Sequence, residues 1–211
     1  MDSTPLYRFF PGLTDRQREQ FDALAALYAD WNAKINVISR KDIDNLYLHH
    51  VVHSLAIARF LGPLAEGTAI LDVGTGGGFP GIPLAIFYPQ CRFHLVDRIG
   101  KKIRVATEVA TAIGLDNVTF RHGDIGECRD RFDYVVSRAV MPLNDLVGLV
   151  RKNIARAPRP GNPCLPGLIC LKGGDLAPEC RGIRSRVEIL PVEPILPDPF
   201  FADKSIVYVQ L

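Results

Sequence analysis

An apolar run that ends abruptly in glycines constrains the fold of this chain more than any other stretch. Residues 70–81 read Ile-Leu-Asp-Val-Gly-Thr-Gly-Gly-Gly-Phe-Pro-Gly, and apolar residues resume directly afterwards. Glycine lacks a Cβ, so it adopts positive φ angles and lets the backbone approach a ligand closely. We therefore expect a buried strand, a tight turn and the first turn of a helix, with the turn forming the floor of a binding site.

Two classes of ligand suit this turn. Gly76, Gly78 and Gly81 form the G-x-G-x-x-G pattern of dinucleotide-binding folds, and Asp97 follows about twenty residues later, as a ribose-binding acid does. Asp72, at the end of the apolar run, favours the second class, because the segment it begins resembles the first motif of S-adenosylmethionine-dependent methyltransferases. An acid there repels a pyrophosphate but is compatible with a zwitterionic cofactor that carries a sulfonium.

From residue 68 onward, segments typical of strands alternate with segments typical of helices. The expected strands are 69–73, 93–96, 118–121, 134–137, 168–171, 187–190 and 205–211, and the expected helices are 82–87, 101–113 and 143–154. Such alternation indicates right-handed βαβ units in a mostly parallel sheet with helices on both faces. We expect the last two strands to close the sheet as an antiparallel hairpin. Ligands of such sheets bind at the carboxyl ends of the strands.

Two amphipathic helices are expected before the alternating part. The first runs from Leu13 to Ile35 with Thr14 as its N-cap. The second begins at Asp42 or Leu46 and ends at Leu61, before a Gly-Pro stop. We expect residues 1–62 to form a helical cap on a core of residues 63–211, the two together making one compact domain.

Composition narrows the class of protein. The 211 residues carry a net charge of only +2, and no apolar run reaches the length of a membrane span. The cysteines include no Cys-x-x-Cys pair and the histidines at 49, 50 and 53 lack a suitably spaced third ligand, so no metal site is expected. Residues 1–11 lack the features of a signal peptide, so we expect a cytoplasmic protein, with a monomer as the default.

Several segments together resemble the RsmG family, also called GidB. They are Trp31-Asn32, Asn36, Arg40, His49-His50 with Ser54, the glycine segment and its tail through Leu84, Asp97 with Gly100-Lys101-Lys102, Phe132-Asp133, Ser137-Arg138-Ala139 and Leu171-Lys172-Gly173. The resemblance runs from about Thr14 to the C-terminus. It implies a class I, Rossmann-like methyltransferase fold with a seven-stranded sheet. It also implies methyl transfer from S-adenosylmethionine to N7 of one guanine in 16S ribosomal RNA of the small ribosomal subunit.

The resemblance also implies roles for individual residues. The expected cofactor-binding set is Gly74, Gly76, Gly78, Phe79, Asp97, Asp124, Ile125 and Arg138, with Asp97 receiving the ribose hydroxyls and Asp124 and Ile125 flanking the adenine. The expected catalytic set is Arg138, His50, Ser54 and Lys172. Arg138 would lie at the mouth shared by cofactor and substrate, and the other three would face the RNA, together with Arg40.

The chemistry implied by this resemblance needs no general base. Guanine N7 carries an in-plane lone pair and no proton, so the protein's task is to align nucleophile, methyl carbon and sulfur. Two basic clusters, at residues 98–104 and 151–159, could contact RNA phosphates. Two alternatives remain open. One is an NAD(P)-linked oxidoreductase that uses the same glycines and Asp97, and the other is a ribosome-assembly factor that binds RNA and the cofactor without turnover.

Overall fold

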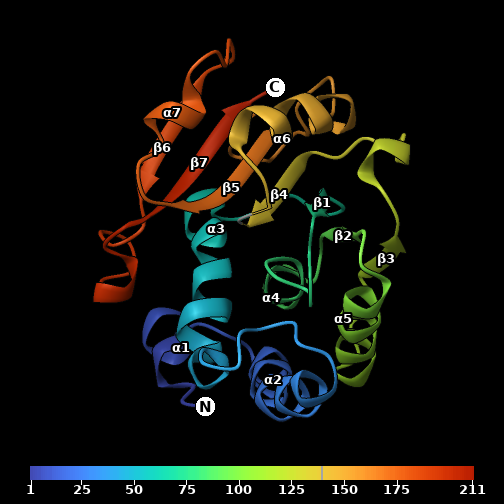
Figure 1. Ribbon diagram of the computed structural model, residues 1–211, viewed down its shortest axis with the longest axis vertical. Helices are drawn as coiled ribbons and strands as arrows, with labels where there is room; N and C mark the ends of the chain where they lie inside the picture. The colour runs from blue at the N-terminus through green and yellow to red at the C-terminus, as the bar shows by residue number, and fades with distance from the viewer. Residues whose placement is uncertain (139) are drawn as a thin grey trace.

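A seven-stranded sheet forms the centre of the molecule in the computed structural model, which describes residues 1–138 and 140–211. Ala139, which belongs to the Ser-Arg-Ala segment of the resemblance, lies outside the described residues. The strands are β1 (Ala69–Val73), β2 (Arg92–Asp97), β3 (Val118–His122), β4 (Tyr134–Arg138), β5 (Gly167–Gly173), β6 (Val187–Pro191) and β7 (Lys204–Gln210). Their order across the sheet is β3-β2-β1-β4-β5-β7-β6, as Figure 1 shows.

Strands β1 to β5 pair in parallel, and only the far edge of the sheet is antiparallel. β6 and β7 pair antiparallel, as expected, but β7 is inserted between β5 and β6 rather than following β6 outward. The mostly parallel order with β1 and β4 side by side creates the crevice at which ligands of such sheets bind. The expected class I, Rossmann-like methyltransferase fold is confirmed.

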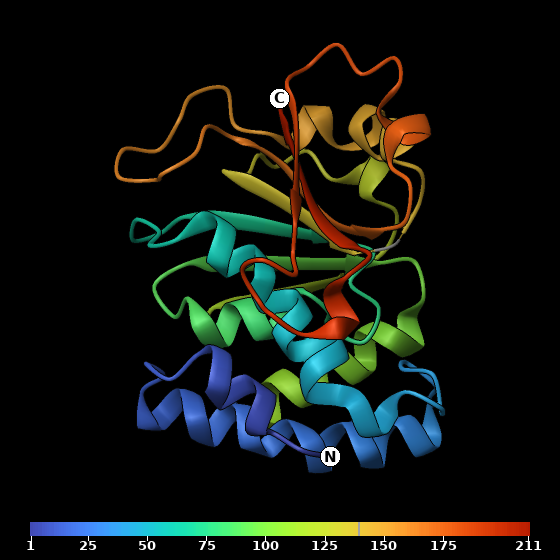
Figure 2. The same cartoon turned by 90° about the vertical axis from the view of Figure 1, so that its left-hand side faces the viewer.

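Side chains of each strand alternate between two buried cores, because successive residues point to opposite faces of a sheet. Ile70 and Val136 belong to the larger core, whereas their neighbours Leu71 and Val135 belong to the smaller one. The larger core is covered by α3 (His53–Leu61), α4 (Gly81–Phe87) and α5 (Gly100–Ala112). The smaller core is covered by α6 (Leu143–Val150) and α7 (Ala177–Cys180). Helices therefore lie on both faces, as Figures 1 and 2 show.

The N-terminal helices α1 (Thr4–Phe9) and α2 (Asp15–Lys34) form a further layer below α3, α4 and α5 (Figure 2). Thr14 caps α2 as expected, in a reciprocal arrangement in which its hydroxyl accepts from Gln17 N and the Gln17 side chain accepts from Thr14 N. Fully buried Phe21 of α2 belongs to the same core as the sheet. The division at residue 62 stays a prediction.

The second expected helix is not a uniform α-helix. It begins with the 3₁₀ turn η1 (Ile43–Asn45), continues as the π-helix η2 (Leu46–Val52), and only then becomes α3. Two short helices, α1 and α7, were not expected from the sequence. The remaining 3₁₀ turns are η3 (Ile125–Glu127), η4 (Arg151–Asn153) and η5 (Pro199–Phe201). π-Helical turns occur mostly at functional sites, and η2 carries two of the histidines singled out above.

No helix in the described part of the chain combines the length and the hydropathy that crossing a membrane requires. Within residues 1–138 and 140–211, no three His, Cys, Asp or Glu side chains come together in a way that could hold a metal ion.

Candidate functional site

Asp72 holds the turn between β1 and α4 in shape. Its side chain is completely buried, and one oxygen, Oδ2, accepts both from Thr75 Oγ1 at 2.6 Å and from Gly81 N at 2.8 Å. Burial raises the pKa of Asp72 to about 7, against these hydrogen bonds and the charge of Arg138, which lower it. The acid singled out in the sequence therefore accepts hydrogen bonds from both ends of the glycine turn, on the buried side of that turn.

The glycines of this turn are required for two different reasons. Gly76 has φ +57°, and a Cβ there would project toward the cleft, with Lys102 Cδ 4.0 Å away as its nearest neighbour. A Cβ on Gly74 would lie 2.5 Å from Val140 Cγ2, and one on Gly77 would lie 2.7 Å from Val37 Cβ. The turn thus gives a ligand access to its backbone at Gly76 and is packed closely by neighbouring segments at Gly74 and Gly77.

The N-terminal layer supplies one wall of the site. Tyr28, fully buried on α2, donates its hydroxyl to Gly77 O at 2.7 Å. Asn32 on the same helix accepts from Val37 N and Ile38 N and donates to Ile38 O, at 2.8–2.9 Å. These bonds fix the segment after α2 so that Val37 lies over the glycine turn.

Asp97, at the carboxyl end of β2, is close to the turn. Its Oδ2 accepts from Gly76 N at 2.8 Å, and its Oδ1 accepts from Ile99 N at 2.8 Å. Its side chain is only partly buried and faces the cleft. The carboxylate retains lone pairs beyond these two bonds, so it can accept from ligand hydroxyls.

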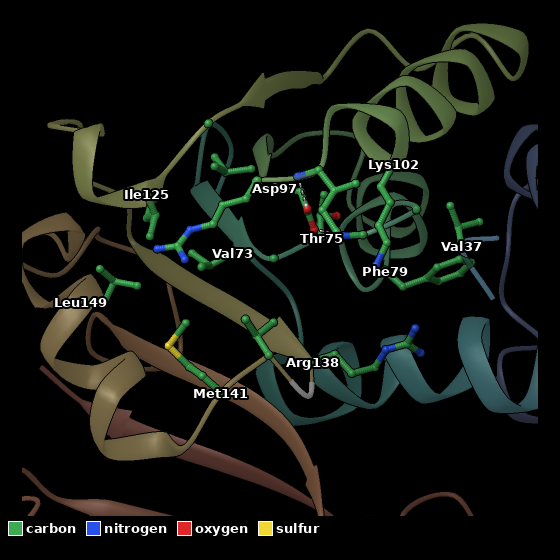
Figure 3. Close-up of a pocket in the computed structure, with 18 residues that line it drawn as sticks. Val37, Val73, Thr75, Phe79, Asp97, Lys102, Ile125, Arg138, Met141 and Leu149 are labelled. Carbon is green, nitrogen blue, oxygen red and sulfur yellow. Dashed lines mark hydrogen bonds between the residues drawn. The ribbon is translucent and has the colours of Figure 1, made fainter. Parts of the chain in front are cut away.

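These elements enclose a cleft of about 570 Å³ at the carboxyl ends of the parallel strands. Figure 3 shows Val73, Ile125, Met141 and Leu149 at one end of it, and Phe79, Val37 and Arg138 at the other, with Asp97 and Thr75 between. Gly74, Gly76 and Gly77 line its floor. One end is thus apolar and the other combines an aromatic ring with a cation. Gly78, φ +107°, is buried and packs against Ile82.

Arg138 extends from the end of β4 toward the second end of the cleft. Its guanidinium carbon lies 5.2 Å from the centre of the Phe79 ring, and Nη2 lies 3.1 Å from His50 Nδ1. Burial lowers the pKa of Arg138 to about 10, while the charge of Asp72 raises it, so the side chain stays positive at neutral pH. Two expected site residues, Arg138 and His50, are therefore in direct contact.

Ser54 and Lys172 were expected on the RNA side, and the structure places both in internal contacts. Ser54 is fully buried, and its hydroxyl donates to His50 O at 2.6 Å within the helix. Lys172 donates to Met141 O at 2.9 Å and pairs with Glu179 at 2.5 Å. Met141 lines the cleft, so Lys172 supports the segment after β4 rather than facing solvent.

Of the two residues expected beside an adenine, only Ile125 lines the cleft. Asp124 instead accepts from Gly126 N at 2.6 Å and pairs with exposed Arg98. Its backbone bond to Gly126 is the main reason that the pKa of Asp124 is lowered. Asp124 therefore shapes the turn that presents Ile125.

Sequence reasoning missed several residues that the fold brings to the site. They are Tyr28, Val37, Thr75, Val140, Met141 and Leu149. Lys102 was noted only as part of a basic cluster, although it lines the cleft. A buried tyrosine on an amphipathic helix gives no local sign that its hydroxyl reaches a turn almost fifty positions away.

The residues present fit S-adenosylmethionine. Gly76 offers backbone where a side chain would fill the cleft, Asp97 offers acceptors for ribose hydroxyls, and the apolar end around Ile125 suits a flat base. Asp72 is buried and does not line the cleft, so it acts on a ligand only through the turn that it holds.

Comparisons with known proteins identify the family of this chain. The family model GidB, rRNA small subunit methyltransferase G, matches residues 17–158. Ribosomal RNA small subunit methyltransferase G of Bacteroides fragilis is 57% identical and covers 98% of both chains. Its counterpart from Bacteroides thetaiotaomicron is 56% identical with the same coverage. Aeropyrum pernix fibrillarin with natively bound S-adenosyl-L-methionine shares the fold, with a TM-score of 0.54, 16% identity and coverage of 74% of this chain and 73% of that one. The chain therefore belongs to the GidB family, that of rRNA small subunit methyltransferase G.

Proposed function

We propose that this protein transfers a methyl group from S-adenosylmethionine to N7 of one guanine in 16S ribosomal RNA of the small ribosomal subunit. The observation that carries the proposal is the cleft itself, in which the glycine turn, Asp97, Phe79 and Arg138 meet at the carboxyl ends of β1, β2 and β4. Family membership supplies the substrate class, and the cleft supplies the cofactor chemistry.

Binding and alignment are the tasks of the residues in this cleft. When bound, S-adenosylmethionine supplies an electrophilic methyl group on a sulfonium. Gly74 and Gly76 provide the floor, Asp97 accepts from ribose hydroxyls, and Ile125 packs beside the base. Because guanine N7 carries no proton, holding the reactants at near-attack distance is sufficient, and no side chain has to accept a proton.

Arg138 and Phe79 stand where the substrate would enter. A guanidinium offers donors that suit acceptors on a guanine edge or on the cofactor carboxylate, and an aromatic face accommodates the positive charge that passes to the guanine. His50 acts on this pair through Arg138, whereas Ser54 and Lys172 act as internal supports. Of the expected catalytic set, Arg138 alone is thus assigned a contact with the reactants, and the other three residues support the site.

The basic cluster nearest the cleft is the better candidate for contacting RNA. Arg98 and Lys102 line the cleft, and Lys101 between them is exposed. In the other cluster, Lys152 donates to Gly126 O and Arg159 pairs with Asp133 at 2.9 Å. We expect Lys101→Ala to weaken RNA binding uniformly and to lower its salt slope by about one.

A monomer stays the expected state of this protein. Sedimentation equilibrium at assay concentrations tests that expectation. A ribosomal substrate would place the protein in the cytoplasm.

Transfer of labelled methyl groups tests the proposal. The protein and labelled S-adenosylmethionine are incubated with small subunits that lack the modification or with naked 16S RNA extracted from such subunits. The RNA is then digested and its nucleosides are separated. The proposal predicts label in 7-methylguanosine alone. Tight cofactor binding with no incorporation into either substrate would instead favour an assembly factor that binds without turnover.

A further inference from the structure

Three side chains form a continuous hydrogen-bonded chain that ends at Arg138. Asp42 Oδ2 lies 2.8 Å from His50 Nε2, and His50 Nδ1 lies 3.1 Å from Arg138 Nη2. Arg138 also donates from Nη1 to His49 O at 3.4 Å. The chain begins in the segment before η1, crosses the π-helix η2 and ends on β4, so it joins the N-terminal layer to the sheet.

The donors and acceptors in this chain fix the tautomer of His50. Arginine has N–H donors and no acceptor, so Nδ1 of His50 must offer its lone pair to Arg138. The proton of a neutral imidazole is then on Nε2, which faces the carboxylate of Asp42. A carboxylate accepts without donating, so Asp42 selects the only tautomer that can hold Arg138.

Burial supports this assignment. Only 13% of the His50 side chain is exposed, and burial together with the charge of Arg138 lowers its pKa to about 4, although Asp42 raises it. His50 therefore stays neutral over the physiological range. Burial alone would raise the pKa of Asp42, but hydrogen bonds with His49, Asn45 and His50 outweigh it and lower that pKa. Asp42 is accordingly a carboxylate under the same conditions.

Asp42 is itself held from a second side. Its Oδ1 lies 2.5 Å from His49 Nδ1, and the His49 ring stacks on Phe200 with ring centres 3.7 Å apart. Phe200 belongs to η5, which precedes β7. One oxygen of the Asp42 carboxylate thus bonds to the stacked ring of His49, and the other bonds to His50. The two bonds give the carboxylate a defined orientation.

We propose that Asp42 is a positioning residue for methyl transfer, acting on Arg138 by setting the tautomer and orientation of His50. The proposal rests on the function proposed above. It assigns a role in the reaction to a residue outside the cleft, in the segment between α2 and η1. In this account His50 orients Arg138 and carries no proton. The guanidinium keeps further N–H donors for the substrate or cofactor, aimed by its bond to His50.

The first test observes the tautomer without any activity. In protein labelled with ¹⁵N-histidine, we expect His50 of the wild type to be neutral with its proton on Nε2 between pH 6 and 8. In the Arg138→Ala background no guanidinium fixes Nδ1 as an acceptor, so we expect Asp42 to keep the proton on Nε2 there and the added change Asp42→Ala to release His50 into a mixture of tautomers. The matched control is Asp44→Asn, which removes a charge from an exposed side chain two positions away and should leave the His50 signals unchanged. The same His50 tautomer in Arg138→Ala and in Asp42→Ala/Arg138→Ala would overturn the proposal.

The second test measures coupling. We expect Asp42→Ala to lower the single-turnover rate at saturating substrates at least tenfold, whereas Asp42→Glu, which keeps a carboxylate, should recover part of that loss. The rate of Asp42→Ala/Arg138→Ala should equal that of Arg138→Ala alone, because both changes break the same chain. A double variant that is slower than Arg138→Ala by the full factor seen for Asp42→Ala alone would contradict the proposal. A general folding defect is distinguished because it would lower the melting temperature of Asp42→Ala, both alone and combined with Arg138→Ala.

Failure of the proposed function is distinguishable from failure of this inference. If wild-type protein transfers no methyl group to small subunits, the substrate is wrong, but the ¹⁵N signals of His50 in Arg138→Ala and Asp42→Ala/Arg138→Ala still decide whether Asp42 sets the tautomer. If the wild type is active, Asp42→Ala keeps the wild-type rate and the two variants share one tautomer, the function stands and the positioning role falls.

Discussion

The carboxylate of Asp97 accepts a hydrogen bond from Gly76 N at 2.8 Å, so the acid that ends β2 is fixed to the turn that follows β1. A hydrogen bond to a charged group contributes roughly 1.5–3 kcal/mol, and Asp97→Ala should therefore weaken S-adenosylmethionine binding about 10- to 100-fold. Isothermal titration calorimetry measures this. Asp116→Ala is the control, because exposed Asp116 precedes β3, at the opposite ends of the strands from the cleft, and should change affinity little. Equal losses in both variants would contradict the assignment.

Tyr28→Phe should weaken cofactor binding through the glycine turn. The change removes the donor to Gly77 O and leaves a buried carbonyl unpaired, at a cost of about 1–3 kcal/mol. Tyr47→Phe is a matched control, since its buried hydroxyl donates to Phe21 O, about two helical turns before Tyr28 on α2. Both variants should lose stability in urea denaturation, but only Tyr28→Phe should lose affinity. An unchanged dissociation constant for Tyr28→Phe would remove its role at the site.

Asp72→Asn should tolerate high pH better than the wild type. The folded-state pKa of about 7 lies above the ordinary value of 3.8, so the folded protein holds an extra proton between these pH values. The resulting stability is present at low pH and is lost as pH rises through 7. Asparagine has no proton to lose, so the free energy of unfolding of Asp72→Asn should rise relative to that of the wild type between pH 4 and 8. The expected rise is about 1.4 kcal/mol for each unit of pKa difference.

Two further results complete the test of Asp72. Asparagine keeps one oxygen, which can accept from both Thr75 and Gly81 as Oδ2 does now. Asp72→Ala has no acceptor and should be less stable than either at every pH. A stability difference between Asp72→Asn and the wild type that does not change with pH would show that Asp72 is an ordinary carboxylate, and one that moves against Asp72→Asn as pH rises would show a lowered pKa.

His53→Leu should reduce acid sensitivity. His53 is buried beside Phe200 and Phe201, its Nε2 has no hydrogen-bond partner in the described structure, and burial lowers its pKa to about 3. The unfolded chain therefore takes up a proton more readily, and stability is lost as pH falls below about 6.5. Urea denaturation at pH 7.5 and pH 5 should show a smaller loss for His53→Leu than for the wild type. The control His122→Leu, at an exposed position, should lose as much stability between pH 7.5 and pH 5 as the wild type. If His53→Leu loses that much as well, the prediction is wrong.

Local features of the site could be predicted from the sequence. The glycine run, its flanking apolar residues and the acid at Asp97 are set by backbone sterics and strand alternation, which act over a few residues. The alternation of strands and helices predicted a mostly parallel sheet with helices on both faces through the βαβ rule, but not the order of its strands. Insertion of β7 between β5 and β6 depends on pairing across the whole sheet, and no local pattern specifies it.

Contacts between distant segments could not be predicted in this way. His50 and Arg138 are brought together across 88 positions, and neither residue type indicates the other. The family resemblance implied that Ser54 faces the RNA, yet its bond to His50 O allows it to be buried inside a helix. Lys172 and Glu179 likewise pair only because α7 folds back over the end of β5.

Mapping the methylated nucleotide tests the central claim most directly. Small subunits lacking the modification are treated with wild-type protein or with Arg138→Ala, and N7-methylguanine is located by strand scission after reduction and aniline treatment. We predict one scission site in 16S RNA with the wild type and at least a tenfold weaker signal with Arg138→Ala, while the variant remains folded. Methyl incorporation without scission, or scission at many guanines, would contradict transfer to N7 of one specific guanine.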